Sequence, residues 1–252
     1  MKKTILTTLG IFCGSMAVSQ AALVAHFDGS SNTSLVNGYT LANTGVATNV
    51  VGGQYGTAYE FDDTNADSLQ ATLGYAGLGN NALGNSFTVM AWYNLDTDAN
   101  PVGNASGRHF LWESSTDHNF SYTLVNSAIG NANATRQTYI DNNAQYGTYA
   151  KGTWEHVAHT ITIGAGNNIT EEIFVNGISQ GSRTAVSVAT SDSAINFGRA
   201  RDSASNRPFD GKMDDIKLYN EVLTAAEIQA AMVAPEPSST ALLGLGGLAL
   251  IL

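Results

Sequence analysis

The stretch that decides the fold is Phe209-Asp210-Gly211-Lys212-Met213-Asp214-Asp215-Ile216-Lys217-Leu218-Tyr219-Asn220-Glu221-Val222-Leu223, which continues into Thr224-Ala225-Ala226-Glu227-Ile228. The part after the glycine predicts a β-strand on which Asp214, Ile216 and Leu218 share one face, because side chains alternate across a pleat. Thr224 and Glu227 have the spacing of a capping box, which predicts a short helix there. A strand followed by one capped helix is typical of the last core strand of a domain.

Asp214 is the unusual residue of this strand. A carboxylate beside two aliphatic side chains must meet hydrogen-bond donors or a cation, because burying an unpaired charge carries a large desolvation cost. We therefore expect Asp214 either to bind a cation or to accept hydrogen bonds from the backbone N–H groups of a loop.

The composition points to an exported β protein. The chain has 252 residues, of which 13% are charged and 26 are glycine, and this suits a protein with many turns rather than a helical bundle. The net charge of −10 argues against nucleic acid and anionic lipid as partners, and is compatible with cations and neutral glycans.

Both ends of the chain carry targeting signals. Residues 1–21 read as a signal peptide, with a basic start, an apolar middle and small residues before the cleavage point. Cys13 is the only cysteine and lies in this leader, so the mature protein is expected to have no disulfide. Residues 235–252, a Pro-Glu-Pro triplet before an apolar run, resemble a PEP-CTERM sorting signal. The run ends at Leu252 without the usual terminal basic cluster, so the sequence is truncated or the signal is degenerate.

Between these signals, the pattern predicts an all-β fold. About eleven to thirteen short strands follow one another without βα alternation, which favours a two-sheet antiparallel jelly-roll sandwich with a short C-terminal helix. Residues 86–95 read as a central strand covered on both faces, and residues 154–163 alternate clearly. Asn176-Gly177 predicts a type I′ hairpin turn.

Four motifs in order resemble those of LamG-like jelly-roll domains, of the concanavalin A-like lectin/glucanase group. They cover the region 23–232 and are Ser86-Phe87-Thr88 through Trp92, Trp154-x-His156-Val157-Ala158, Phe174-Val175-Asn176-Gly177, and the final Asp214-Asp215 strand. The resemblance implies that an aspartate near the first strand and one on the last strand hold a calcium ion. The matching positions here are Asp28 and Asp214. Asp63-x-Asn65-x-Asp67 is a second, weaker candidate for Ca²⁺.

Catalytic patterns are missing from the sequence. Retaining glucanases of this group carry a Glu-x-Asp-x-x-Glu strand, because two carboxylates must flank the sugar bond, and this chain has none. Glu171 and Glu172 are neighbours and must face opposite sides of a strand. The same holds for His156 and His159, three residues apart, so they cannot share a metal. We expect that the protein is not an enzyme.

Glycan binding needs exposed aromatic side chains. Four tyrosines in loop-like sequence are candidates, although they could equally pack the loops: Tyr55, Tyr75, Tyr146 and Tyr149. The segment 199–207 has three arginines, which suit either an anionic partner or a solvated loop. We expect an exported, non-catalytic carbohydrate-binding or adhesion module, sorted to the cell envelope or extracellular matrix. The alternatives are a glycoside hydrolase on the same fold and a structural matrix protein without a small ligand.

Overall fold

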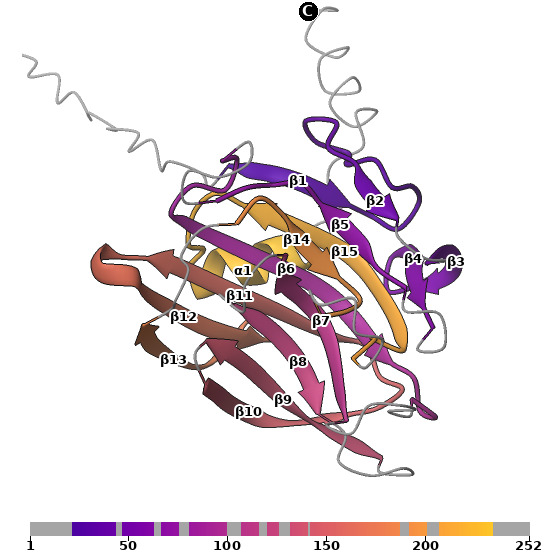
Figure 1. The fold of residues 1–252 in the computed structure, drawn as a ribbon. Helices are drawn as coiled ribbons and strands as arrows, with labels where there is room; N and C mark the ends of the chain where they lie inside the picture. The colour runs from indigo at the N-terminus through magenta and orange to yellow at the C-terminus, as the bar shows by residue number, and fades with distance from the viewer. Residues whose placement is uncertain are drawn as a thin grey trace, which may run out of the picture.

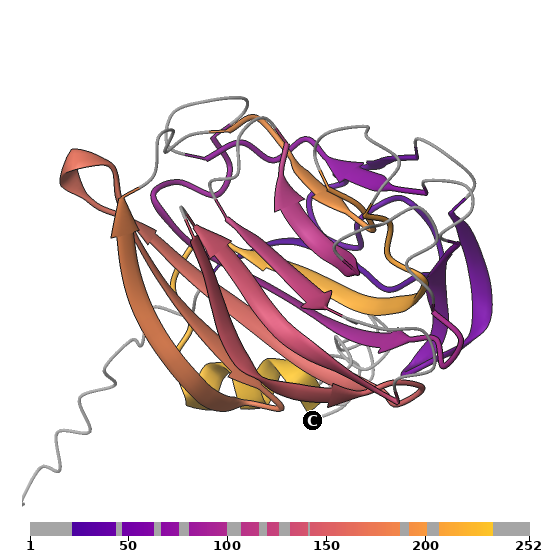
Figure 2. The same ribbon diagram turned by 60° about the horizontal axis from the view of Figure 1, so that its bottom comes forward.

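The computed structural model describes residues 22–43, 47–62, 67–75, 81–99, 107–115, 120–125, 132–140, 142–186, 192–200 and 207–233. These residues form two antiparallel sheets that face each other, with one helix, α1 (Ala225–Val233), on the outside of one of them (Figures 1 and 2). The predicted jelly-roll sandwich with a short C-terminal helix is confirmed. The predicted signal peptide and sorting segment lie outside the described residues.

The helix-bearing sheet has eight strands. Their order across the sheet is β13 (Ile178–Val186), β12 (Asn168–Val175), β11 (Glu155–Ile163), β6 (Ser86–Leu95), β15 (Gly211–Tyr219), β4 (Gly56–Phe61) and β3 (Thr48–Gly53), and β1 (Leu23–Phe27) also pairs with β15. A short 3₁₀ turn, Ala165–Asn167, precedes β12. The β12–β13 turn contains Asn176 at φ 49° and Gly177 at φ 76°, as the Asn-Gly pair predicted.

The facing sheet has seven strands. Their order is β10 (Asn142–Ala150), β9 (Asn133–Ile140), β8 (Ser121–Val125), β7 (Arg108–Ser114), β14 (Ile195–Phe197), β5 (Leu69–Ala71) and β2 (Leu41–Asn43).

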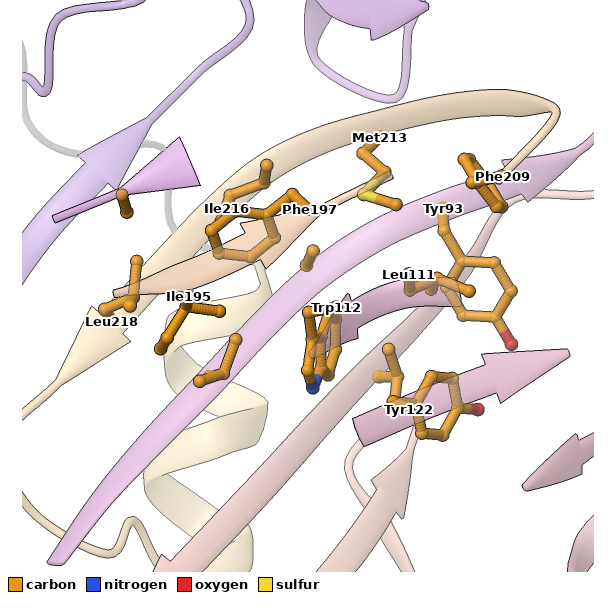
Figure 3. Close-up of a cluster of buried hydrophobic side chains, with 14 of the residues drawn as sticks. Tyr93, Leu111, Trp112, Tyr122, Ile195, Phe197, Phe209, Met213, Ile216 and Leu218 are labelled. Carbon is orange, nitrogen blue, oxygen red and sulfur yellow. The ribbon is translucent and has the colours of Figure 1, made fainter. Parts of the chain in front are cut away.

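The core between the sheets is rich in aromatic side chains, as Figure 3 shows. Trp112 of β7 stacks on Tyr122 of β8 with ring centroids 5.3 Å apart, and both are fully buried. From the opposite sheet, Met213, Ile216 and Leu218 of β15 point into the same core. This core lies between the layers, so the other side chains of each strand face outward from the sandwich.

Strand β15 departs from simple alternation. Met213 and Ile216 both face the core, although three positions apart, because the register shifts between Asp214 and Lys217 and Asp215 takes a φ of 54°. The prediction that Asp214 shares a face with Ile216 and Leu218 is therefore wrong. The bulge turns Asp214 to the outer side of the sheet, where it is nevertheless buried.

Helix α1 covers part of that outer side. The predicted capping box forms, with the Thr224 backbone N–H donating to Glu227 Oε2 at 2.8 Å and the Glu227 N–H donating to Thr224 Oγ1 at 3.3 Å. A small second core lies beneath the helix and contains Met90, Phe174 and Ile228. The helix thus covers Met90 and Phe174, which face away from the main core.

The structure has fifteen strands in its described residues, which is more than predicted. Three strands that the sequence did not indicate are β2, β3 and β10, and all three stand at an edge of a sheet. An edge strand has a partner on one side only, so it needs neither a long apolar run nor strict alternation. The sequence TNVVGG of β3 illustrates this, since none of its residues is buried.

Candidate functional site

The outward side of the seven-stranded sheet is the candidate binding surface, called here the polar face. Tyr122 and Leu124 of β8 point into the core, so Ser121 and Thr123 between and beside them point outward. Residues that pair with Ser121 and Thr123 on the neighbouring strands face the same outward side. One continuous row consists of Gln70, Asn196, Glu113, Ser121 and Tyr139, and the next contains Phe110, Thr123, Gln137 and Gln145.

Several polar groups of this face are withdrawn from solvent. Glu113, Ser121 and Asn196 are at most 2% exposed, whereas Gln70 and Tyr139 are half-buried. Gln70 Nε2 donates to Asn196 Oδ1 at 2.8 Å. In contrast, Ser121 Oγ and Gln137 Oε1 are buried with no hydrogen-bond partner among the described residues. Buried polar atoms usually have partners, so such atoms indicate a place for a water molecule or a ligand group.

A cavity of about 130 Å³ lies on the polar face and is lined by Arg108, Phe110, Tyr139 and Arg207. Burial, and then the nearby charge of Arg207, lower the pKa of Arg108, while Tyr139 and Glu113 raise it. The cavity therefore combines two cations with two aromatic rings.

A second polar cluster joins the two sheets from inside. The Trp112 indole N–H donates to Nδ1 of His159 at 3.3 Å, which leaves Nε2 as the ring nitrogen that donates. Nε2 donates to Glu171 Oε2 at 2.7 Å, and Glu171 Oε1 accepts bonds from Arg183 Nε at 2.6 Å and Thr138 Oγ1 at 2.5 Å. Glu171 and His159 have no exposed side-chain surface, so the cluster is closed to substrates.

The predicted opposite orientation of neighbouring residues holds in this region. Glu171 lies in the interior, whereas Glu172 accepts a bond from Ser179 on the exposed side. His156 packs its ring against Trp92 at 5.4 Å on the outer side of the sheet, away from His159. The two histidines therefore do not share a site.

Of the predicted calcium pair, Asp28 directly follows β1 and Asp214 lies at the bulge of β15, near enough for the charge of Asp28 to raise the pKa of Asp214. Asp28 Oδ1 accepts bonds from the backbone and side chain of Ser30 at 3.0 and 2.6 Å. Asp214 Oδ2 accepts the backbone N–H of Tyr55 at 2.8 Å, which is the loop hydrogen bond expected as the alternative to a cation. Asp214 Oδ1 is buried and has no partner among the described residues.

The surroundings of Asp214 make its ionised form costly. Burial, and then the charges of Asp215 and Asp28, raise its pKa from 3.8 to about 6, against the lowering effect of the backbone N–H groups of Tyr55 and Asp215. Asp215 itself is paired, with His26 Nε2 at 2.6 Å and Lys217 Nζ at 2.9 Å.

Calcium takes six to eight oxygen ligands. Asp214 Oδ1, which has no hydrogen-bond partner among the described residues, would supply one of them. The described residues contain no group of three or more His, Cys, Asp or Glu side chains placed to hold a metal. Asp63 and Asn65 of the second candidate lie outside the described residues. Its last member, Asp67, lines an acidic cavity of about 330 Å³ with Glu60, Asp62, Asp96 and Asp210.

The four tyrosines predicted as candidates for glycan binding do not form one exposed surface. Tyr75, Tyr146 and Tyr149 are buried at 0%, 8% and 1% exposure and pack the interior, which is the alternative that the sequence left open. Tyr55 is 45% exposed but lies on the opposite side of the molecule from the polar face, against Trp92. The aromatic residues of the polar face, Phe110 and Tyr139, were missed. The alternation of Ser121-Tyr122-Thr123-Leu124 was the signal that could have indicated this face.

The facing sheets and the polar outer surface define a jelly-roll sandwich of the lectin type. The chain belongs to the concanavalin A-like lectin/glucanases superfamily, whose family profile matches residues 65–229. None of the curated proteins compared with it matches. No helix among the described residues combines the length and the apolar character that crossing a membrane requires.

Solved structures share the fold at low sequence identity. Domain 4 of AbnA, a GH43 extracellular arabinanase from Geobacillus stearothermophilus, in complex with arabinotriose, superposes with a TM-score of 0.58 at 15% identity, over 84% of this chain and 98% of that one. The receptor binding domain of botulinum neurotoxin C/D mosaic serotype superposes with a TM-score of 0.56 at 13% identity, over 82% of this chain and 50% of that one. The binding domain of botulinum neurotoxin DC, in complex with SialylT, superposes with a TM-score of 0.54 at 12% identity, over 82% of this chain and 50% of that one.

Proposed function

We propose that the protein is a non-catalytic glycan-binding module and that the polar face of the seven-stranded sheet is its binding surface. The observation that carries the proposal is that two buried polar atoms, Ser121 Oγ and Gln137 Oε1, have no hydrogen-bond partner among the described residues. They are set among amides, hydroxyls and two aromatic rings. Sugars offer hydroxyl groups that can donate and accept hydrogen bonds, and they match such a surface. Two solved structures with this fold were obtained with a sugar ligand, which supports the same proposal.

The acidic side chains that the structure describes on the polar face support a binding rather than a catalytic role. Glycoside hydrolysis uses two carboxyl groups, roughly 5 to 9.5 Å apart, on either side of the sugar bond. Among the paired strand residues of the polar face that the structure describes, Glu113 is the one acidic side chain. Release of reducing sugar from a polysaccharide, lost in Glu113→Gln, would favour the hydrolase instead.

Tyr139 provides the first test of the surface. We expect Tyr139→Ala to weaken binding to glycans that an array identifies by about tenfold, since large aromatic contacts at interfaces contribute more than 1 kcal/mol. Titration calorimetry of the purified domain with the best array ligand measures the change. Tyr55→Ala, on the opposite side of the molecule, is the matched control and should leave the affinity unchanged. Equal losses in both variants, or no binding to any glycan, would reject the proposed surface.

We also infer that the protein is exported and sorted by its C-terminal segment to the cell envelope or extracellular matrix. The support comes from the sequence of residues 1–21 and 235–252. We expect the mature protein in the cell envelope or medium to begin after Ala21, which N-terminal sequencing can determine. Intact Met1 on protein that stays in the cytoplasm would contradict the inference.

A further inference from the structure

The arginines of the polar face stand out in an acidic protein. The whole chain has 11 lysines and arginines against 21 aspartates and glutamates. Two of these few cations, Arg108 and Arg207, nevertheless line the same small cavity. They come from distant parts of the chain, since Arg108 begins β7 and Arg207 lies four residues before β15.

The position of Arg207 is fixed by its neighbours in the chain. The carbonyl of Pro208 accepts a hydrogen bond from Nδ1 of His109 at 3.0 Å, and the Phe209 N–H donates to the carbonyl of Gly198 at 2.7 Å. His109 is buried, and this burial lowers its pKa to about 4, so the imidazole is neutral near pH 7. The guanidinium of Arg207 lies 5.9 Å from the ring centroid of Phe110, within the range of a cation–π contact.

Two guanidinium groups beside one cavity repel each other. After burial, this repulsion is the second cause that lowers the pKa of Arg108, whereas Tyr139 and Glu113 raise it. An anion in the cavity would relieve the repulsion and would bind both cations. Guanidinium groups suit this purpose because their planar N–H forks match the oxygen atoms of carboxylate and oxyanion groups.

We propose that the cavity lined by Arg108, Phe110, Tyr139 and Arg207 is a subsite for an anionic sugar unit, carrying a carboxylate or a sulfate ester. This assignment rests on the proposed glycan-binding function of the polar face. The volume of about 130 Å³ is well below the roughly 300 to 1,000 Å³ of sites that enclose a whole small-molecule ligand. The cavity therefore receives one charged unit of a longer glycan.

Oligogalacturonate and its methyl ester test the proposal, because the ester removes the charge and keeps the sugar chain. By calorimetry at low ionic strength, we expect the wild type to bind the acid at least about tenfold more tightly than the ester. Arg207→Gln should weaken binding of the acid by about tenfold or more and leave binding of the ester unchanged. A sulfated oligosaccharide, run in parallel, shows which anionic group the subsite prefers.

Lys212→Gln is the matched control, since it removes one positive charge from a side chain of the other sheet that pairs with Glu60. It should leave both affinities within about twofold, and thermal melting should show that both variants are folded. Equal wild-type affinity for acid and ester, or equal effects of the two substitutions, would overturn the anionic subsite and leave the glycan-binding function standing. No binding of either oligosaccharide or of any glycan on an array would overturn both.

Discussion

Glu171→Ala is expected to lower the free energy of unfolding by about 3 to 5 kcal/mol, the usual cost of breaking a buried ion pair by removing one partner. The substitution leaves the N–H of His159, the hydroxyl of Thr138 and the guanidinium of Arg183 without their shared acceptor. His159 has no exposed side-chain surface, so water cannot easily replace the lost bond. Guanidinium unfolding followed by tryptophan fluorescence measures the change.

The neighbouring residue gives an internal control. Glu172→Ala alters the same strand and the same charge, but the side chain accepts one bond from the exposed Ser179. We expect its effect to stay within about 0.5 kcal/mol, as for most surface substitutions. A loss below about 1 kcal/mol in Glu171→Ala, or similar losses in both variants, would show that the inter-sheet cluster contributes little to stability.

The same cluster predicts a dependence of stability on pH. Burial favours a raised pKa for Glu171, but the bonds from His159, Arg183 and Thr138 outweigh it and lower the pKa from 4.5 to about 2. A carboxyl group with a lowered pKa in the folded state stabilises the protein above its unfolded value and loses this contribution as the pH falls. Wild-type stability should therefore decline from about pH 4.5 to pH 2, and Glu171→Gln should show a flatter profile in this window.

Asp214→Asn is expected to stabilise the protein, by about 2 to 3 kcal/mol above pH 6, since each pKa unit corresponds to about 1.4 kcal/mol. Because the pKa of Asp214 is raised from 3.8 to about 6, the folded state holds the proton more tightly than the unfolded chain does. Stability then falls as the pH rises through this interval and stays low above it. An asparagine keeps an acceptor for the Tyr55 N–H and carries no charge.

Chemical denaturation of wild type and variant at pH 4 and pH 7.5, in chelator, measures this effect. Asp98→Asn, at an exposed position, is the control and should change little at either pH. A variant less stable than the wild type at pH 7.5 in chelator would contradict the prediction.

If calcium binds at Asp28 and Asp214, the effect of Asp214→Asn on stability has the opposite sign when Ca²⁺ is present. If Ca²⁺ binds there, it stabilises the wild type by mass action and holds Asp214 ionised. The wild type would then melt higher with Ca²⁺ than with chelator, and Asp214→Asn would lose this increase. Equal melting temperatures of the wild type in both conditions would remove the calcium hypothesis and leave the hydrogen bond from Tyr55 as the partner of the carboxylate.

Much of the fold could be predicted because its central strands carry strong local signals. The apolar run of β6 and the alternation of β11 mark strands that lie beside each other in the middle of the helix-bearing sheet. The Asn176-Gly177 turn and the Thr224–Glu227 capping box are encoded within a few residues, so they too could be read directly. Edge strands such as β3 carry no such signal, since half of their backbone groups and most of their side chains face water.

The candidate site was mostly hidden from the sequence. Its residues are neighbours only because β5, β14, β7, β8 and β9 pair in one particular register, and strand register is a property of the folded sheet. A shift of register between Phe110 and Trp112 also breaks the alternation along β7 that would have indicated its outward side. The bulge at Asp215 misled the assignment of Asp214 for the same reason.

The position of β15 has a consequence for biosynthesis. This strand is the last one among the described residues, yet it occupies the middle of its sheet, with β6 on one side and β4 and β1 on the other. A nascent polypeptide that ends before Phe209 lacks β15, the strand that joins β1, β3 and β4 to the rest of the helix-bearing sheet. Completion of the helix-bearing sheet must therefore wait until β15 has been synthesised, and such late pairing between distant strands makes folding slow.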